Sequence, residues 1–384
     1  MIDLTLEGLL SAAREQTGLD TFHSESWREG YEILLGDIAT TNMLNDVGRG
    51  YVGKILLDGL KTRLQVDEYH RQHPELAATP VTRPVFVLGA PRTGTTLTSY
   101  MFDADPARRS LLKWEAYNVA PPAAPGEART DPRCLEMLAA DHAALEANPS
   151  LAAQHVEFAN GPTEDVHLMA QDGRSVMLDV FTNLPTYRDW ILFCDARPAF
   201  EHRKRVYQIL QSTNPGKWTL KMPSDSLFVR SLFSVFPDAK VVWTHRDPFT
   251  ATASIFSLRY NARTNFNVDP DLPFMRDSYL RQLAFHIARP LEMSRERPAD
   301  FYNLYYDDMM ADPIAQMRKI YAWLGDDYSA EAEAGQRAWL AANPQGRFGR
   351  HDYSLEKWGL TREQLEPYYS DYLRAHPGVV GAAR

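Results

Sequence analysis

A glycine-bracketed loop that follows an apolar run has the residue types and spacing of a phosphate-binding site. Residues 85–88 predict a buried strand, Gly89 and Gly94 bracket a tight loop, and Thr95 begins a helix with an apolar stripe. The backbone N–H groups of such a loop, together with the helix N-terminus, point at an anion. The spacing Gly89-x-x-x-x-Gly94 is that of a Walker A loop, and it predicts a site for phosphate.

The charges of this loop differ from those of a magnesium-dependent nucleotidase. The lysine expected directly after Gly94 is replaced by Thr95, and the positive charge lies inside the loop, at Arg92. The loop therefore predicts phosphate binding, but it fits poorly with magnesium-dependent hydrolysis of a nucleoside triphosphate.

Two further basic residues follow predicted strands downstream. Residues 218–220 predict a short strand that ends at Lys221, and residues 240–244 predict a buried strand that ends just before Arg246. The strand–helix–strand spacing indicates a right-handed crossover and a parallel sheet. Ligands of such sheets bind at the carboxyl ends of the strands. We therefore expect Arg92, Lys221 and Arg246 to lie at one edge of the sheet.

Both anion-binding segments resemble motifs of sulfotransferases that use 3′-phosphoadenylyl sulfate (PAPS). Residues 91–97 are similar to the loop that holds the donor's 5′-phosphosulfate. Residues 217–258 are similar to the stretch with the 3′-phosphate motif, whose positions here are Arg246 and Ser254. The two motifs occur in the family order, and the similarity is clearest over residues 83–118 and 217–260. The resemblance is to bacterial-type members, and it implies a PAPS site formed by Arg92, Thr93, Gly94, Thr95, Thr96, Arg246 and Ser254. It also implies that Lys221 contacts the leaving phosphosulfate.

Two carboxylates are candidates for the base that accepts the proton of the attacking hydroxyl. Glu115 lies in an apolar and aromatic run, where the protein-tyrosine sulfotransferase branch carries its acidic base. Many sulfotransferases have a histidine shortly after the lysine that corresponds to Lys221, whereas this chain has Asp225, near a helix start where a carboxylate often caps. We expect Glu115 to be the base and Asp225 to be the alternative. If replacing either carboxylate leaves turnover unchanged, His155 or His167 must be reconsidered as the base.

A basic, glycine-containing loop near the C-terminus is a further candidate for donor binding. It reads Gly346-Arg347-Phe348-Gly349-Arg350-His351. In relatives a C-terminal basic loop closes over the nucleotide, so the resemblance implies that Arg347 and Arg350 contribute to the PAPS site.

The composition excludes several classes of protein. The chain has 384 residues, 44% of them hydrophobic, which is enough to bury a sizeable core. Its net charge of −9 argues against a nucleic-acid partner. Cys134 and Cys194 have neither metal nor redox spacing, so we expect no metal site. We find no segment long enough to span a membrane and no signal peptide, and we therefore expect a cytoplasmic protein.

Helical periodicity predicts how the rest of the chain is organised. Residues 1–80 predict an N-terminal helical extension, which we expect to cover the sheet, with dimerisation or a substrate lid as alternatives. Residues 81–384 predict the sulfotransferase domain, with helices over most of 131–215 and a last helix over 361–375. The expected fold is α/β, with a P-loop-type parallel sheet flanked by helices.

The expected function is PAPS-dependent transfer of a sulfuryl group to a hydroxyl of an alcohol or phenol. The aromatic residues between 158 and 200 either line an acceptor pocket or pack in the core, and the first alternative indicates an apolar acceptor, a small molecule or a lipid. The identity of the acceptor and the presence of a homodimer stay open. The alternatives are a P-loop kinase and a non-catalytic nucleotide-binding protein. A kinase would need a lysine at Thr95 and an acidic magnesium ligand where this chain has His245 and Arg246.

Overall fold

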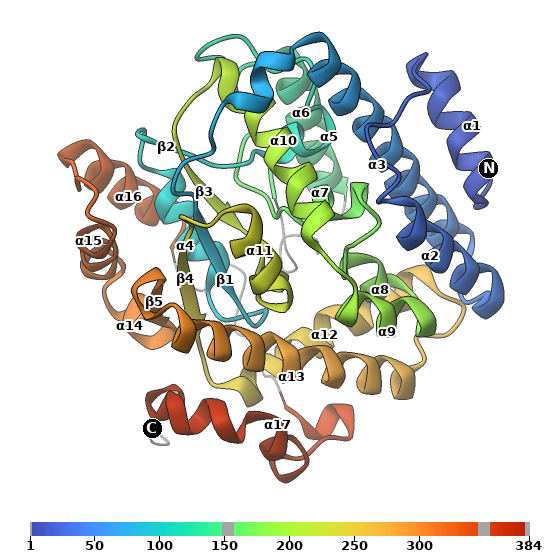
Figure 1. Ribbon diagram of the computed structural model, residues 1–384. Helices are drawn as coiled ribbons and strands as arrows, with labels where there is room; N and C mark the ends of the chain where they lie inside the picture. The colour runs from blue at the N-terminus through green and yellow to red at the C-terminus, as the bar shows by residue number, and fades with distance from the viewer. Residues whose placement is uncertain (1, 148–156, 345–353, 381–384) are drawn as a thin grey trace.

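Five parallel strands form a sheet that is flanked by helices (Figure 1). The computed structural model describes residues 2–147, 157–344 and 354–380. The strand order is β2-β3-β1-β4-β5, with every pairing parallel. The strands are β1 (Val85–Gly89), β2 (Arg108–Arg109), β3 (Lys217–Lys221), β4 (Lys240–His245) and β5 (Phe301–Tyr305). The α/β class and the parallel sheet predicted from the sequence are confirmed.

The sheet separates two hydrophobic clusters. In β1, Val85 and Val87 belong to one cluster, whereas Phe86 and Leu88 belong to the other, as the alternation of side chains along a strand requires. The first cluster includes side chains from α4 (Thr95–Asp103), α14 (Tyr306–Ala311) and α15 (Pro313–Leu324). The second and larger cluster includes side chains from α10 (Arg197–Thr213), α11 (Val229–Val235) and α13 (Leu272–Glu296).

The N-terminal helices share the larger cluster with the sheet. They are α1 (Leu6–Thr17), α2 (Arg28–Thr41), α3 (Asp46–Gln72) and the short 3₁₀ helix η1 (Pro74–Ala78). A buried ion pair, with Arg63 Nη1 2.7 Å from Asp172 Oδ2, ties α3 to the end of α7 (Val166–Gln171). The N-terminal helices therefore pack against one side of the part of the chain that contains the sheet. The predicted domain boundary near residue 80 stays a prediction.

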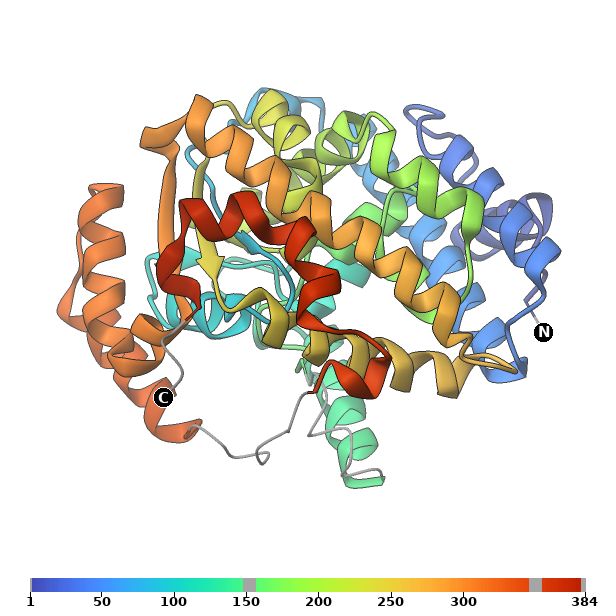
Figure 2. The same cartoon turned by 90° about the horizontal axis from the view of Figure 1, so that it is seen from below.

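The remaining elements complete the helical layers. Figure 2 shows α17 lying across α13, against which it packs. The bounds are α5 (Lys113–Tyr117), α6 (Pro132–Ala147), α8 (Met177–Phe181), α9 (Pro185–Phe193), η3 (Pro223–Phe228), α12 (Pro248–Phe266), η4 (Pro298–Asp300), α16 (Ala330–Ala342), η5 (Glu356–Trp358), α17 (Arg362–Ala375) and η6 (Pro377–Val379). In the described part of the chain, every helix is too short or too polar to cross a membrane.

The register of the sheet brings the three predicted basic positions to one edge. β1 pairs with β3 on one side, where Val87 lies opposite Lys221, and with β4 on the other, where Gly89 lies opposite Thr244. The loop that follows Gly89 is therefore flanked by Lys221 at the end of β3 and by Arg246 just beyond β4. The strand order reverses at β1, which is where open parallel sheets bind their ligands.

A buried ionic cluster fixes the segment that follows β3. Arg203 donates to both oxygens of Asp225, at 2.7 and 3.0 Å, and to Asp165 Oδ2 at 2.9 Å. The Tyr207 hydroxyl donates to the other oxygen of Asp165 at 2.9 Å. Burial raises the pKa of Asp225, although the Arg203 guanidinium opposes this shift. The cluster joins α10, η3 and the chain before α7, and its carboxylates depend on Arg203 for their counter-charge.

We expect Arg203→Met to destabilise the fold strongly, because it leaves two buried carboxylates without a cation. Removing one partner of a buried ion pair costs about 3–5 kcal/mol. Urea denaturation followed by tryptophan fluorescence measures the loss in the free energy of unfolding. Arg230→Met is the control, since its salt bridges to Glu292 and Glu296 are exposed and should contribute at most about 1 kcal/mol. If the two variants lose the same free energy of unfolding, Arg203 does not stabilise the buried carboxylates as described.

Candidate active site

The loop after β1 allows close approach of an anion to the backbone. Gly89 has a φ of +153°, and a Cβ there would lie 2.5 Å from the Thr244 hydroxyl oxygen. Gly94, with a φ of +100°, is the N-cap of α4, and no side chain of the described residues caps this helix. Both positions therefore require glycine, and the first N–H groups of α4 form the kind of helix N-terminus that binds anions.

Contacts around Arg92 join the two predicted phosphate motifs. Arg92 has a φ of 72°, a left-handed conformation that is strained for a residue other than glycine. Its Nε donates to Ser254 Oγ on α12 at 3.0 Å, and its carbonyl oxygen accepts from Arg246 Nη1 at 3.0 Å. The Arg246 guanidinium lies over the ring of Tyr306, 4.2 Å from the centroid. Arg92, Arg246 and Ser254 are thus neighbours, as the sequence predicts.

The threonines of the loop divide into a supporting residue and two residues at the cavity. The Thr93 hydroxyl is buried, donates to the Ala90 carbonyl oxygen at 2.7 Å and lies 2.6 Å from Thr244 Oγ1. Its side chain therefore holds the loop against β4. Thr95 and Thr96 line the adjoining cavity, together with Gly94.

Lys221 lies at the carboxyl end of β3 and pairs with two glutamates that were not predicted as site residues. Its Nζ donates to Glu164 Oε1 at 2.9 Å and to Glu157 Oε1 at 3.3 Å. Burial disfavours the charged form of Lys221, but the two carboxylates outweigh it and raise its pKa. Both glutamates line the cavity, so this ion pair brings negative charge to the edge of the phosphate loop.

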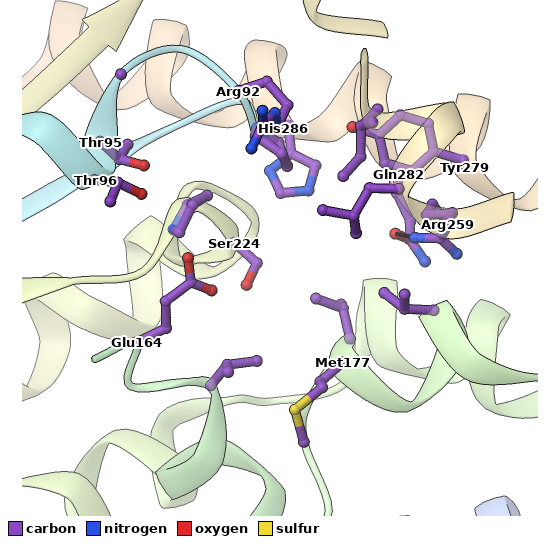
Figure 3. A pocket seen from close by; sticks show the side chains of 18 of the residues that line it. Arg92, Thr95, Thr96, Glu164, Met177, Ser224, Arg259, Tyr279, Gln282 and His286 are labelled. Carbon is purple, nitrogen blue, oxygen red and sulfur yellow. Dashed lines mark hydrogen bonds between the residues drawn. The ribbon is translucent and has the colours of Figure 1, made fainter. Parts of the chain in front are cut away.

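A cavity of about 440 Å³ opens beside the phosphate loop (Figure 3). The labelled side chains of Thr95, Thr96 and Glu164 lie on one side of it. Much of its remaining wall is apolar, formed by Val166, Val176, Met177, Val180, Phe181, Ile255 and Leu258. The wall comes from α7, α8 and α12, so the cavity joins an anion-binding edge to a surface suited to an apolar molecule.

The two carboxylates proposed from the sequence as bases do not line this cavity. Glu115 is 1% exposed; Arg109 Nη2 donates to its Oε1 at 2.5 Å, and the Leu112 N–H donates to its Oε2 at 3.1 Å. It thus caps α5 as part of a buried ion pair. Asp225 is held by Arg203 in the same way. The carboxylates that do line the cavity are Glu164 and Glu157.

The other predicted site residues divide between the cavity and the chain outside the described residues. His167 lines the cavity, its Nδ1 lies 3.0 Å from the Tyr117 hydroxyl, and burial lowers its pKa. His155, Arg347 and Arg350 lie outside the described residues, so their predicted roles stay predictions.

Comparisons with known proteins agree with the arrangement of this site. A model of the sulfotransferase family matches residues 84–331. The crystal structure of sulfotransferase STF9 from Mycobacterium avium is 39% identical, with a TM-score of 0.91 and 97% of each chain covered. That of sulfotransferase STF1 from Mycobacterium tuberculosis H37Rv is 27% identical, with a TM-score of 0.85 over 97% of this chain and 100% of that chain.

A third relative is similar over a shorter range. Omega-hydroxy-beta-dihydromenaquinone-9 sulfotransferase Stf3 from Mycobacterium bovis is 27% identical over 310 residues, which cover 73% of this chain and 71% of that protein. The kinase and non-catalytic alternatives are not favoured by these matches. Because the family match spans the phosphate loop and Arg246, which the structure places side by side, the chain belongs to the sulfotransferase family and is a PAPS-dependent sulfotransferase.

Proposed function

We propose that the chain transfers the sulfuryl group of PAPS to the hydroxyl of an apolar alcohol or phenol in the cytoplasm. The observation that carries this proposal is the composition of one cavity, which has the phosphate loop on one side and an apolar surface over much of the remaining wall. Stf3 is named for an omega-hydroxylated dihydromenaquinone. We extend to this chain only the class of that acceptor, an apolar molecule with a hydroxyl.

The donor's two anionic ends fit the groups at the sheet edge. We assign the 5′-phosphosulfate to Arg92, to the N-terminus of α4 and to the hydroxyls of Thr95 and Thr96, which line the cavity. We assign the 3′-phosphate to Arg246 and Ser254, which contact the backbone and the side chain of Arg92 respectively. Charge-assisted hydrogen bonds of this kind are the strong ones in anion sites.

The residues beside the loop can support both the leaving and the attacking oxygen. When PAPS is bound, it supplies an activated sulfuryl group. Negative charge grows on the departing phosphate, where Arg92 stabilises it electrostatically. Lys221 keeps its predicted role as a second cation at this edge, and its ammonium group also pairs with Glu164.

Glu164 has the geometry of a general base. Its Oε1 accepts from Lys221, whereas none of the described residues donates to its Oε2. Figure 3 shows the carboxylate directed into the cavity, on the side of Thr95 and Thr96. A base must lie within hydrogen-bond reach of the proton it accepts. We therefore assign to Glu164 the proton of the acceptor hydroxyl.

Transfer of radiolabelled sulfate from PAPS to a panel of alcohols tests the proposed function. We expect long-chain and polycyclic alcohols to be sulfated and free sugars to be poor acceptors, because an apolar wall cannot replace the hydration of a sugar. Calorimetry with 3′-phosphoadenosine 5′-phosphate (PAP), compared with ATP and magnesium, checks the donor separately. Preferential sulfation of sugars would refute the acceptor class but not the donor.

We expect Glu164→Gln to lower turnover by about 10²–10⁴-fold, the usual contribution of a general base, with PAP affinity near that of the wild type. Glu115→Gln is the matched comparison. It should lower the melting temperature, since Arg109 loses its charged partner, while the folded enzyme keeps most of its turnover. If Glu115→Gln abolishes turnover and Glu164→Gln does not, Glu115 is the base after all.

We expect Arg246→Ala to weaken binding of PAP by about ten- to a hundredfold, the loss that follows from a hydrogen bond to a charged group. AMP lacks the 3′-phosphate, so its affinity should change much less. Calorimetry with both nucleotides separates the two effects. Equal losses would mean that Arg246 acts only through its bond to the Arg92 carbonyl oxygen.

A further inference from the structure

One face of α13 brings three polar side chains to the wall of the cavity. Tyr279, Gln282 and His286 are three and four residues apart, which places them on one helix face, and all three line the cavity. Each is at most 2% exposed. Figure 3 shows Tyr279 and Gln282 across the cavity from Glu164 and Thr95, and His286 pointing into the cavity. These residues lie outside the donor contacts assigned above.

Hydrogen bonds of Ser226 fix which ring nitrogen of His286 carries the proton. Ser226 Oγ lies 2.8 Å from the Pro223 carbonyl oxygen and 2.6 Å from His286 Nδ1. A hydroxyl has one proton and a carbonyl oxygen only accepts, so both contacts are hydrogen bonds only if Nδ1–H donates to Ser226. Nε2 of the neutral ring then carries a lone pair, and none of the described residues donates to it.

His286 remains neutral at physiological pH. Burial, together with the nearby charges of Arg259 and Arg289, lowers its pKa to about 3. Its Nε2 is therefore a permanent hydrogen-bond acceptor at the cavity wall.

The Tyr279 hydroxyl is a buried donor without a partner. Its oxygen has almost no exposed surface and forms no hydrogen bond with any described residue. The amide of Gln282, in contrast, is engaged, because its Nε2 donates to Asp179 Oδ2 at 2.8 Å. Buried polar groups are normally hydrogen-bonded, and an unpaired one destabilises the protein. An unpaired hydroxyl at the wall of a substrate cavity is explained if a polar group of the bound substrate accepts a hydrogen bond from it.

We propose that the acceptor carries a second, uncharged polar group besides the hydroxyl that is sulfated, and that Tyr279 and His286 recognise it. This inference rests on the proposed function and narrows the acceptor class to an apolar skeleton with a polar substituent at each end. A hydroxyl fits both residues, because it can accept from Tyr279 and donate to Nε2 of His286. A carboxylate does not fit, since it has no proton to donate to Nε2 of the neutral ring.

Straight-chain α,ω-diols, compared with primary alcohols of the same length over a series of lengths, test this proposal. We expect kcat/KM of the best diol to exceed that of its alcohol by about ten- to a hundredfold, because the alcohol leaves buried polar groups unpaired. Tyr279→Phe and His286→Asn should each lower this ratio by about tenfold. Dissociation constants of diol and alcohol, measured by calorimetry in the presence of PAP, give the same comparison without turnover.

Two substitutions at His286 separate recognition from structure. Asparagine retains a donor to Ser226 at the place of Nδ1 but lacks the acceptor at Nε2. Glutamine can place an amide oxygen near Nε2, so His286→Gln should restore part of the preference for the diol. Tyr368→Phe is the matched control, because Tyr368 is 45% exposed on α17 and does not line the cavity, and this variant should keep the wild-type ratio.

The outcomes distinguish this inference from the proposed function. Since the Tyr279 hydroxyl has no partner, Tyr279→Phe should leave the melting temperature unchanged or higher, and a clear decrease would overturn the inference by revealing an internal partner. It is also overturned if wild-type enzyme sulfates diol and alcohol equally, or if neither variant changes the ratio; the proposed function then stands. If the enzyme neither binds any of these alcohols in the presence of PAP nor sulfates any of them with PAPS, the proposed function fails, and this inference fails with it.

Discussion

A hydrogen bond from Arg246 to the carbonyl oxygen of Arg92 joins segments that are 154 positions apart in the chain. It is formed because β1 and β4 are neighbours in a parallel sheet and therefore end at the same edge. The strained backbone at Arg92 is held by this bond and by the contact of its guanidinium with Ser254. The sheet thus fixes the proposed anion site without help from a ligand, and binding to a preorganised site costs little free energy for ordering its residues.

The partners of buried carboxylates decide which of them can take part in chemistry. Arg203 engages both oxygens of Asp225, and Arg109 with a backbone N–H engages both oxygens of Glu115. A guanidinium group is a rigid fork, whereas an ammonium group is a compact charge. Lys221 therefore neutralises Glu164 through one oxygen and leaves the other directed at the cavity.

The parts of the site that could be predicted are those encoded by local spacing. The glycines of the phosphate loop and the Asp247-Pro248 helix start after Arg246 lie within short segments, and the structure has each element where the spacing predicts it. Strand β2 was not predicted, since Arg108 and Arg109 have no strand signal and pair with β3 only through the tertiary fold.

Glu164 was missed for a related reason. Its partner Lys221 is 57 positions away, and no local pattern distinguishes it from a carboxylate in the first turn of a helix. For Glu115, the sequence correctly indicated a carboxylate in an apolar setting. Its pairing with Arg109, however, is decided by side-chain packing, which periodicity does not encode.

The ion pair between Arg63 and Asp172 links the N-terminal helices to the helix that forms one wall of the cavity. Asp172 closes α7, and α7 contributes Val166 and His167 to the cavity. In the proposed function, the sheet edge binds the donor, whereas helices that pack against α3 bind the acceptor. Mutations in this outer layer can therefore exchange one alcohol for another while sulfuryl transfer is retained. With this arrangement, a single fold can form different sulfated products while the residues that transfer the sulfuryl group stay the same.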